Sequence, residues 1–335
     1  MKKKLFLSVT EKASIYNSSN YRWRIERIFN VVEDIDDAEV VLLTDPFYNQ
    51  HDFLQIKEKI NARLYSFSDE PIWDLYSNVV TPEKLKENVV EWNGHKITQL
   101  NHFNSDIFEF DTLPYYLTHH PDIVAKYITM AMQWSDKTDK ELVDIWKKRP
   151  INIQALTGKA NNRFEKKVSK IFNECNMVVR SKIAEEIGKA KENHLDGKGW
   201  SKQSGETCVS NARDNRSWHY HKMKSCMSSR YLLSMENTLA PNYITEKIFD
   251  AVFSLNVPIF NFPPDHKFHK LGFKGINLYG IDDTKTYIND SVQKDNSLDV
   301  LENLIQGKKL LKTAGNNMLK ESIERVEKLN KKLNE

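Results

Sequence analysis

The segment from Arg230 to Phe260 constrains the fold of this chain more than any other. It begins with the apolar run Tyr231 to Met235 and ends with the apolar run Val257 to Phe260, and both runs have the composition of buried strands. Between them a proline-containing turn precedes Thr245, a residue type that often caps a helix, and an amphipathic stretch comes next. Strand, helix and strand in this order are typical of an α/β sheet with covering helices.

The same alternation extends over the rest of the chain. Short apolar runs bounded by turn residues predict strands near Leu5 to Val9, Val40 to Leu43, Arg63 to Phe67 and Ile151 to Leu156. We also expect a strand near Met177 to Val179. Residues 184–228 show little periodicity and indicate loops and insertions.

The length of 335 residues favours two domains. We place the boundary at Arg149-Pro150, which gives an N-terminal α/β domain over 1–149, a second α/β domain over 150–315 and an amphipathic helix over 316–335. The expected architecture is a pair of facing doubly wound, Rossmann-like domains, with the ligand in the cleft at the carboxyl ends of the strands.

Composition excludes several classes of protein. With 49 Lys and Arg against 46 Asp and Glu, the net charge is +3, which is not the basic excess of a nucleic-acid-binding protein. The first apolar run, Leu5 to Val9, is shorter than the roughly 7–15 residues of a signal peptide core. No stretch approaches the roughly 18 apolar residues of a transmembrane helix, and three cysteines without close spacing suggest neither a disulfide framework nor a zinc site. We therefore expect a cytoplasmic protein.

The C-terminal residues carry Leu319, Ile323, Val326 and Leu333 at helical spacing among many charges of both signs. This pattern predicts a helix that docks on the protein or joins copies of the chain into a homo-oligomer. Membrane contact is expected to be peripheral at most, at the inner face of the membrane.

Polar residues gather at one edge of the predicted sheet around the 230–260 segment. The strand delivers Glu236 and Asn237 to its carboxyl end, and Thr245, Glu246 and Lys247 stand at the start of the next helix. A helix start offers backbone N–H groups and the positive end of the helix dipole, and Lys247 adds a full charge, so the edge suits a diphosphate. A capped helix with a solvated first turn is the competing interpretation.

This stretch closely resembles the signature of the α1,3-fucosyltransferases, which is an apolar strand, E-N-S, a turn, Y-V-T-E-K, an amphipathic helix and V-P-I-Y. Here it appears as Glu236-Asn237-Thr238, Tyr243-Ile244-Thr245-Glu246-Lys247 and Val257-Pro258-Ile259-Phe260. The resemblance implies a GT-B fold, with two facing α/β domains and the donor GDP-fucose in the C-terminal one. It also implies a glycan acceptor, free or lipid-linked, no catalytic metal and no further cofactor.

The resemblance assigns roles residue by residue. Lys247 matches the signature lysine, and Arg163 is the candidate for the family's diphosphate-binding arginine. Tyr243 and Glu246 match positions that contact the phosphate and the ribose, while Asn237 and Thr245 complete the nucleotide-binding set. Glu236 matches a carboxylate near the donor sugar.

The catalytic base comes from the N-terminal half in the family, in a stretch of the form G-E-N-E-x-P. The matching residues here, Phe67-Ser68-Asp69-Glu70-Pro71, are shorter, so either Asp69 or Glu70 can hold the role, and we choose Glu70. Both come after a predicted strand, where partial burial can raise a carboxylate's pKa toward that of a useful base.

The predicted function is inverting, metal-independent transfer of L-fucose from a GDP-sugar to a glycan hydroxyl, in an α1,3 linkage and in lipopolysaccharide O-antigen or related surface polysaccharide synthesis. Where the family has W-G-S-P, this chain has Asn261-Phe262-Pro263-Pro264, so a related donor such as GDP-colitose stays open. One rival is a nucleotide-sugar-binding protein without catalysis. Another is a metal-dependent transferase that uses the D-x-D pattern at Asp34-Ile35-Asp36, although a solvated loop explains that pattern better.

Overall fold

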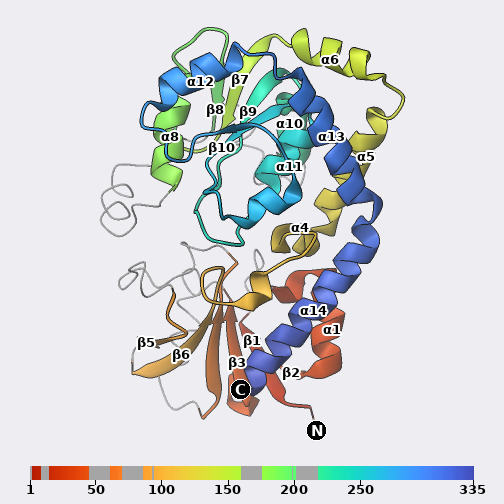
Figure 1. Ribbon diagram of the computed structural model, residues 1–335. Helices are drawn as coiled ribbons and strands as arrows, with labels where there is room; N and C mark the ends of the chain where they lie inside the picture. Colours follow the sequence, from red (N-terminus) through yellow and green to blue (C-terminus); the bar gives the residue numbers. More distant parts are fainter. Residues whose placement is uncertain are drawn as a thin grey trace. The chain divides into compact units, whose positions relative to one another are not determined.

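The structure, a computed structural model, describes residues 2–8, 15–44, 61–69, 86–92, 94–159, 176–197, 199–200 and 218–335. The chain divides into two compact units, coloured along the sequence in Figure 1. The first unit contains Met1–Pro121, Ala240–Tyr243 and Ala314–Glu335, and the second contains Asp122–Leu239 and Ile244–Thr313.

The first unit is built on a six-stranded sheet. Its strands are β1 (Lys4–Ser8), β2 (Asn30–Val32), β3 (Val40–Thr44), β4 (Arg63–Phe67), β5 (Val89–Trp92) and β6 (His95–Leu100). They lie in the order β2-β1-β3-β4-β6-β5, and all neighbours are parallel except β5, which is antiparallel to β6. Since β2 and β3 lie on opposite sides of β1, the sheet is wound in both directions.

Both faces of this sheet are buried. Alternate residues of β3 separate into two clusters, with Val40 and Leu42 in one and Val41 and Leu43 in the other. Parallel strands are normally covered by other elements on both faces of the sheet, and this explains why β3 is apolar along its whole length. The α-helices of the unit are α1 (Ser19–Ile28), α4 (Tyr115–His119) and α14 (Ala314–Asn334), and its 3₁₀ turns are η1 (Ile15–Asn17), η2 (Ile35–Asp37) and η3 (Asp106–Phe108).

Helix α14 comes from the C-terminus yet packs in the N-terminal unit, alongside α1 (Figure 1). Val326, Leu329 and Leu333 are buried in the same cluster as β1 and β3. Helix α14 therefore docks within the first unit, which is one of the two alternatives that its sequence pattern left open, but Leu319 and Ile323 of the expected apolar stripe are exposed. Among the described helices, none combines the length and apolar character needed to cross a bilayer.

The second unit is built on a five-stranded parallel sheet. Its strands are β7 (Ile151–Leu156), β8 (His194–Asp196), β9 (Ser229–Leu233), β10 (Val257–Phe260) and β11 (Ile276–Asn277). They lie in the order β11-β10-β9-β7-β8. After β7 the chain adds β8 on one side and then returns to add β9 on the other, so the winding direction reverses between β7 and β9.

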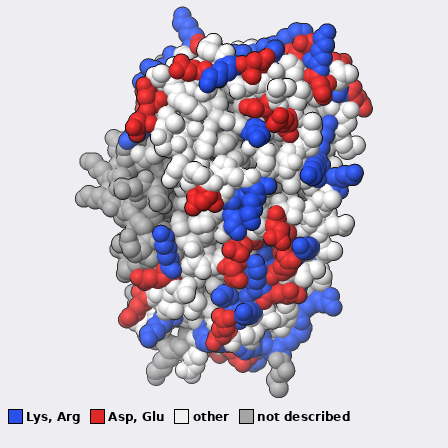
Figure 2. Space-filling view, viewed as in Figure 1, with Lys and Arg blue, Asp and Glu red and all other residues white. Residues whose placement is uncertain are grey.

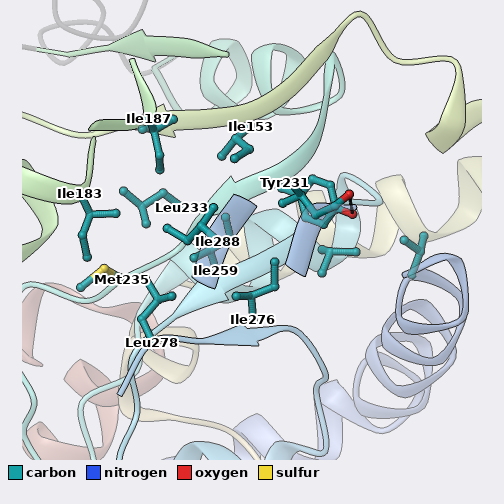
Figure 3. Close-up of a cluster of buried hydrophobic side chains, with 14 of the residues drawn as sticks. Ile153, Ile183, Ile187, Tyr231, Leu233, Met235, Ile259, Ile276, Leu278 and Ile288 are labelled. Carbon is teal, nitrogen blue, oxygen red and sulfur yellow. Dashed lines mark hydrogen bonds between the residues drawn. The ribbon is translucent and has the colours of Figure 1, made fainter. Parts of the chain in front are cut away.

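Helices cover both faces of this second sheet. They are α5 (Pro121–Gln133), α6 (Asp139–Lys147), α8 (Asn176–Ile187), α10 (Trp218–Cys226), α11 (Glu246–Phe253), α12 (Thr284–Val292) and α13 (Ser297–Lys312), with one described 3₁₀ turn, η4 (Lys267–Leu271). Tyr231 and Leu233 of β9 join the large core with Ile183 of α8, which Figure 3 shows at close range. Leu232 points to the opposite face, against Cys226 of α10 and Ala251 of α11.

The two-unit α/β organisation confirms the predicted fold class at the level of each unit. The cleft expected between the units concerns their relative placement and stays a prediction. The units also divide elsewhere than the expected boundary at 149/150, because the second unit begins at Asp122. Side chains from before that boundary bind the second unit directly: the indole N–H of Trp134 donates to the carbonyl of Phe253 at 2.9 Å, and that of Trp146 donates to the carbonyl of Arg230 at 2.9 Å.

Two local expectations were wrong. Met177 to Val179 lies inside α8 rather than in a strand, and the region 184–228, expected to be loops, contains β8 and α10. The short β-branched run at Val178 and Val179 has strand character only in isolation. Over a longer window, Ile183 and Ile187 continue the buried stripe of a helix.

Candidate functional site

The carboxyl edge of the second sheet is the place where its topology favours a ligand. In open α/β sheets, ligands bind beyond the carboxyl ends of the strands where the winding direction reverses. Here that point lies between β7 and β9. Strand β9 leads directly into Met235, Glu236 and Asn237, so the predicted polar residues stand at the reversal point.

Glu236 anchors the start of α11. Its carboxylate accepts the backbone N–H of Thr245 at 2.6 Å and the Thr245 hydroxyl at 2.8 and 3.0 Å. The Nζ of Lys247 donates to the same carboxylate at 3.0 Å and to the Thr245 Oγ1 at 2.8 Å. The Glu236 side chain has no exposed surface. It therefore fixes the turn and the first residues of the helix from a position inside the protein.

Thr245 occupies the expected N-cap position, but its side chain does not cap the helix. The hydroxyl turns toward the Glu236 carboxylate instead. The first-turn N–H groups of α11 therefore lack the usual threonine acceptor. A helix start of this kind is suited to an anion, and Lys247 stands beside it with 18% of its side chain exposed.

A chain of buried charges continues from this helix start. Glu246 lies 3.0 Å from Nζ of Lys222 and 3.8 Å from Nζ of Lys247, and Lys222 also lies 2.6 Å from Asp250. Asp250 accepts the hydroxyl of Tyr127 at 2.8 Å. Lys222 comes from α10 and the two acids from successive turns of α11, so the network ties the two helices together.

The network keeps Glu246 ionised. Burial by itself would raise the pKa of this carboxyl, but the positive charges of Lys222 and Lys247 outweigh burial and hold the pKa well below its usual range. Burial would likewise lower the pKa of Lys222, yet Asp250 and Glu246 raise that pKa above its usual value. A carboxylate held in this state accepts hydrogen bonds, which is the chemistry that a ribose or sugar hydroxyl needs.

Arg180 also lies at this edge of the sheet, although the sequence did not single it out. It lies on α8, is buried, and donates from Nη1 to the carbonyl of Met235 and to Oδ1 of Asn237, both at 2.9 Å. The predicted residue Asn237 is thus held by an arginine at the same sheet edge. If a helix had been predicted over this segment in place of a strand, Arg180 would have stood at helical spacing from Ile183 and Ile187. It would then have been placed on the helix face that packs on the sheet.

The remaining predicted residues lie elsewhere. Tyr243 belongs to the first unit, where its buried ring meets that of His102 edge-on at a centroid distance of 5.1 Å. Asp69 is half-buried directly after β4, also in the first unit. Glu70 and Arg163 fall outside the described residues.

The substitution at Phe262 is accommodated within the second unit. Its ring is buried and stacks on Phe268 and His266 at centroid distances of 4.4 Å each. The added bulk relative to the glycine of the signature therefore packs into an aromatic cluster. The neighbouring Asn261 exchanges side-chain hydrogen bonds with Asn176 at 2.6 and 3.2 Å.

The described residues contain no group of three metal-ligating side chains that could hold a cation. The D-x-D pattern serves local structure, because Asp34 accepts the backbone N–H of Asp36 at 3.0 Å and begins η2. On the face shown in Figure 2, basic and acidic side chains are interspersed rather than gathered by sign. The absence of a catalytic metal stays a prediction.

Comparisons with known proteins bear on this edge. Residues 161–274 match the family model described as glycosyltransferase family 10 (fucosyltransferase), C-terminal. A search of curated protein sequences finds no match. Three crystal structures of alpha1,3-fucosyltransferase, one with GDP-fucose, one with GDP and one named without a ligand, each align with 95% of this chain and 90% of the solved chain. Their sequence identities are 13%, 14% and 15%, and their TM-scores are 0.46, 0.48 and 0.48, in the same order. Because these scores lie below 0.5, only the family match supports an assignment of function.

Proposed function

We propose that this protein is a family 10 glycosyltransferase that transfers L-fucose from GDP-fucose to a hydroxyl group of a glycan, since residues 161–274 match the C-terminal model of the fucosyltransferase family. The observation that carries the proposal is the coincidence of two independent results. The matched residues, 161–274, include the whole helix start and its anchors, and this helix start stands where the sheet topology favours a ligand.

The donor diphosphate is assigned to the N-terminus of α11. Lys247 supplies a charge there that is partly exposed and already oriented by Glu236. Arg180 supplies a second positive charge at the same sheet edge, and Arg163 keeps its predicted role as a third. Glu246 is assigned to the ribose hydroxyls, since its carboxylate is held ionised. In this proposal Glu236 acts by holding Thr245 and Lys247 rather than by contacting the sugar.

The proposed reaction is a single displacement that inverts the anomeric carbon. The acceptor oxygen forms a bond to the anomeric carbon while the bond between this carbon and the phosphate oxygen of GDP breaks. The proton of the acceptor hydroxyl passes to a carboxylate base, Asp69 or Glu70. GDP departs with one more negative charge than it had in the sugar ester. Lys247 and Arg180 balance that charge, which is why we propose that no metal is needed.

The test is GDP release from GDP-fucose, measured with a panel of glycan acceptors, in excess EDTA and with GDP-colitose in parallel. Lys247→Met should lower turnover about 100-fold, because a charge-assisted contact to the leaving group is worth roughly 2–3 kcal/mol. Lys285→Met is the matched control, since Lys285 lies in the same unit with 64% of its side chain exposed. It should leave turnover unchanged.

Each rival predicts a different result. GDP binding without turnover on any acceptor would support the non-catalytic binding protein. Loss of activity in EDTA would point to a metal-dependent transferase. Faster turnover with GDP-colitose than with GDP-fucose would change the proposed donor but leave the proposed donor site as it stands. Equal turnover of Lys247→Met and the unaltered protein would remove α11 from the donor site.

A further inference from the structure

Lys222 is a deeply buried cation near the proposed donor site. Its ammonium bridges two carboxylates one helical turn apart on α11, with Glu246 at 3.0 Å and Asp250 at 2.6 Å. Only 9% of its side chain is exposed, against 18% for Lys247. Lys222 is therefore surrounded by protein groups, and any effect it has on a ligand passes through its neighbours.

The ion pairs of this network contain, among the described residues, more acids than bases. Among the described residues that form it, three carboxylates, Glu236, Glu246 and Asp250, face two lysines, Lys222 and Lys247, which leaves a net charge of −1. Without Lys222 the same cluster would carry −2. A diphosphate placed at the start of α11 would meet that excess negative charge at close range, in a partly buried region where charges are weakly screened.

We propose that Lys222 is a positioning residue for the donor: it neutralises the acidic pair Glu246 and Asp250, and so allows the start of α11 to accept a diphosphate. The inference rests on the proposed function, since it presumes that the ligand is a nucleoside diphosphate. It adds to that function a residue outside the signature and an electrostatic reason for its presence. Lys222 lies on α10, ahead of the signature in sequence, and acts on the ligand only through Glu246 and Asp250.

The geometry supports two linked effects. First, Lys222 draws the Glu246 carboxylate toward α10, so Lys247 at 3.8 Å is not its sole counter-charge. Lys247 then keeps its closer contact with Glu236 at 3.0 Å, and the exposed part of its side chain can still attract an anionic ligand. Second, Lys222 keeps Glu246 ionised, as the depressed pKa of that carboxyl indicates, so the acid can accept hydrogen bonds from hydroxyl groups.

A purely structural brace between α10 and α11 is the competing explanation. Both explanations predict that the loss of Lys222 destabilises the fold. They differ for Asp250→Asn. Removing this negative charge brings the cluster to zero, while asparagine keeps an oxygen for the Tyr127 hydroxyl, which lies 2.8 Å from Asp250 Oδ1. The electrostatic role predicts tighter diphosphate binding, whereas a brace predicts weaker or unchanged binding.

The experiment is calorimetric titration of GDP and of uncharged guanosine into the full-length protein. We expect Asp250→Asn to bind GDP about 3- to 10-fold more tightly, Lys222→Met to bind it about tenfold more weakly, and the double variant to return to within about threefold of the unaltered protein. Lys222→Arg should stay close to the unaltered protein. Guanosine affinity should change less than about twofold throughout.

The outcomes separate the inference from the function on which it rests. If the unaltered protein binds no GDP, the proposed function fails first. If it binds GDP but Asp250→Asn binds no more tightly, or guanosine and GDP affinities change together, Lys222 is a brace and the inference is wrong. Should Lys222→Met fail to fold, the Asp250→Asn result decides alone, because that substitution keeps shape and hydrogen-bonding oxygen.

Discussion

Two buried carboxylates perform the same task in the two units, and only one of them stands at a candidate site. In the first unit, Glu321 of α14 accepts the backbone N–H groups of Asp111, Thr112 and Leu113, just ahead of α4, and pairs with Arg325 at 3.3 Å. In the second unit, Glu236 accepts the N–H of Thr245 just ahead of α11 and pairs with Lys247. Each acid fixes the segment before a helix and holds a basic partner.

The partners show the difference. Arg325 has 1% of its side chain exposed and donates to the Thr118 hydroxyl at 2.9 Å and the Leu113 carbonyl at 3.0 Å, so its charge is used inside the protein. Lys247 keeps 18% exposed and stands at a helix start without a side-chain cap. A buried ion pair is therefore weak support for a ligand site, while an oriented but partly exposed cation at a helix start is stronger support.

The largest effect should come from breaking the enclosed pair. Arg325→Met leaves Glu321 buried without its counter-charge and removes the donors to Thr118 and Leu113, so we expect a loss of about 3–5 kcal/mol in the free energy of unfolding. Urea denaturation measures it. Lys320→Met on the same helix, where 61% of the side chain is exposed, should cost less than about 0.5 kcal/mol. A similar cost for both variants would mean that α14 does not dock as described.

The second prediction compares the two acids directly. Glu236→Gln and Glu321→Gln each keep the shape of the side chain but weaken hydrogen bonds to backbone N–H groups, so each should cost about 1–3 kcal/mol of stability. Only Glu236→Gln should also weaken GDP binding, by about tenfold, because it releases Lys247 and Thr245, which Asp250 does not hold, and we expect this loss of orientation to outweigh the removal of one negative charge. The two measurements are denaturation and calorimetric titration. If both variants bound GDP equally well, the pair Glu236–Lys247 would have no more to do with the ligand than the pair Glu321–Arg325 has.

The third prediction uses pH to separate the units. Burial, with a smaller contribution from His120, lowers the pKa of His119 in the first unit to about 3, against 6.5 for the exposed group. Because the folded pKa is the lower one, the unfolded chain binds the extra proton. The stability that neutral His119 contributes is complete above pH 6.5 and is lost as the pH falls toward 3, at about 1.4 kcal/mol per pH unit.

Glu246 behaves differently in the second unit. Its pKa is also depressed, but from an ordinary value of 4.5, so its stabilising charge persists down to that pH and is lost only below it. Between about pH 6.5 and pH 5, protection against hydrogen exchange, taken relative to the intrinsic exchange rate at each pH, should therefore fall in peptides from 15–44 before it falls in peptides from 244–260. His119→Phe should remove the difference. A uniform response of both units would contradict the pKa assignment of His119.

Much of the fold could be predicted from sequence because strands and helices leave local patterns. The segments β1, β3, β4, β7, β9 and β10 all coincide with apolar runs that turn residues bound. The docking of α14 in the first unit could not be predicted, since the same amphipathic pattern suits an oligomeric or a docked helix. Arg325 and Glu321 give no local sign that they will meet Thr118 and Leu113.

The candidate site shows the same limit. Glu236 and the helix start Thr245-Glu246-Lys247 lie in one contiguous signature, so their proximity could be predicted from the sequence. Lys222 and Arg180 come from segments that looked like a loop and a strand, and only the packing of α8 and α10 on the sheet brings them to this edge. Long-range pairing of charges has no periodicity, so a single sequence does not reveal it.

The smallest effect tests the orientation of α14. Leu319 is 52% exposed and Ile323 is 39% exposed, although both fit the apolar stripe that the sequence suggested. Replacing either with Gln should change the free energy of unfolding by less than about 0.5 kcal/mol, because a surface side chain away from caps and pairs contributes little. Val326→Ala, on the buried side, should cost clearly more, since it leaves a cavity in the core of the first unit. What decides the test is which variants lose more free energy of unfolding. If the Gln variants lose more than Val326→Ala, α14 is rotated about its axis and Arg325 leaves its enclosed position. The distinction between an enclosed and a ligand-facing ion pair would then no longer hold.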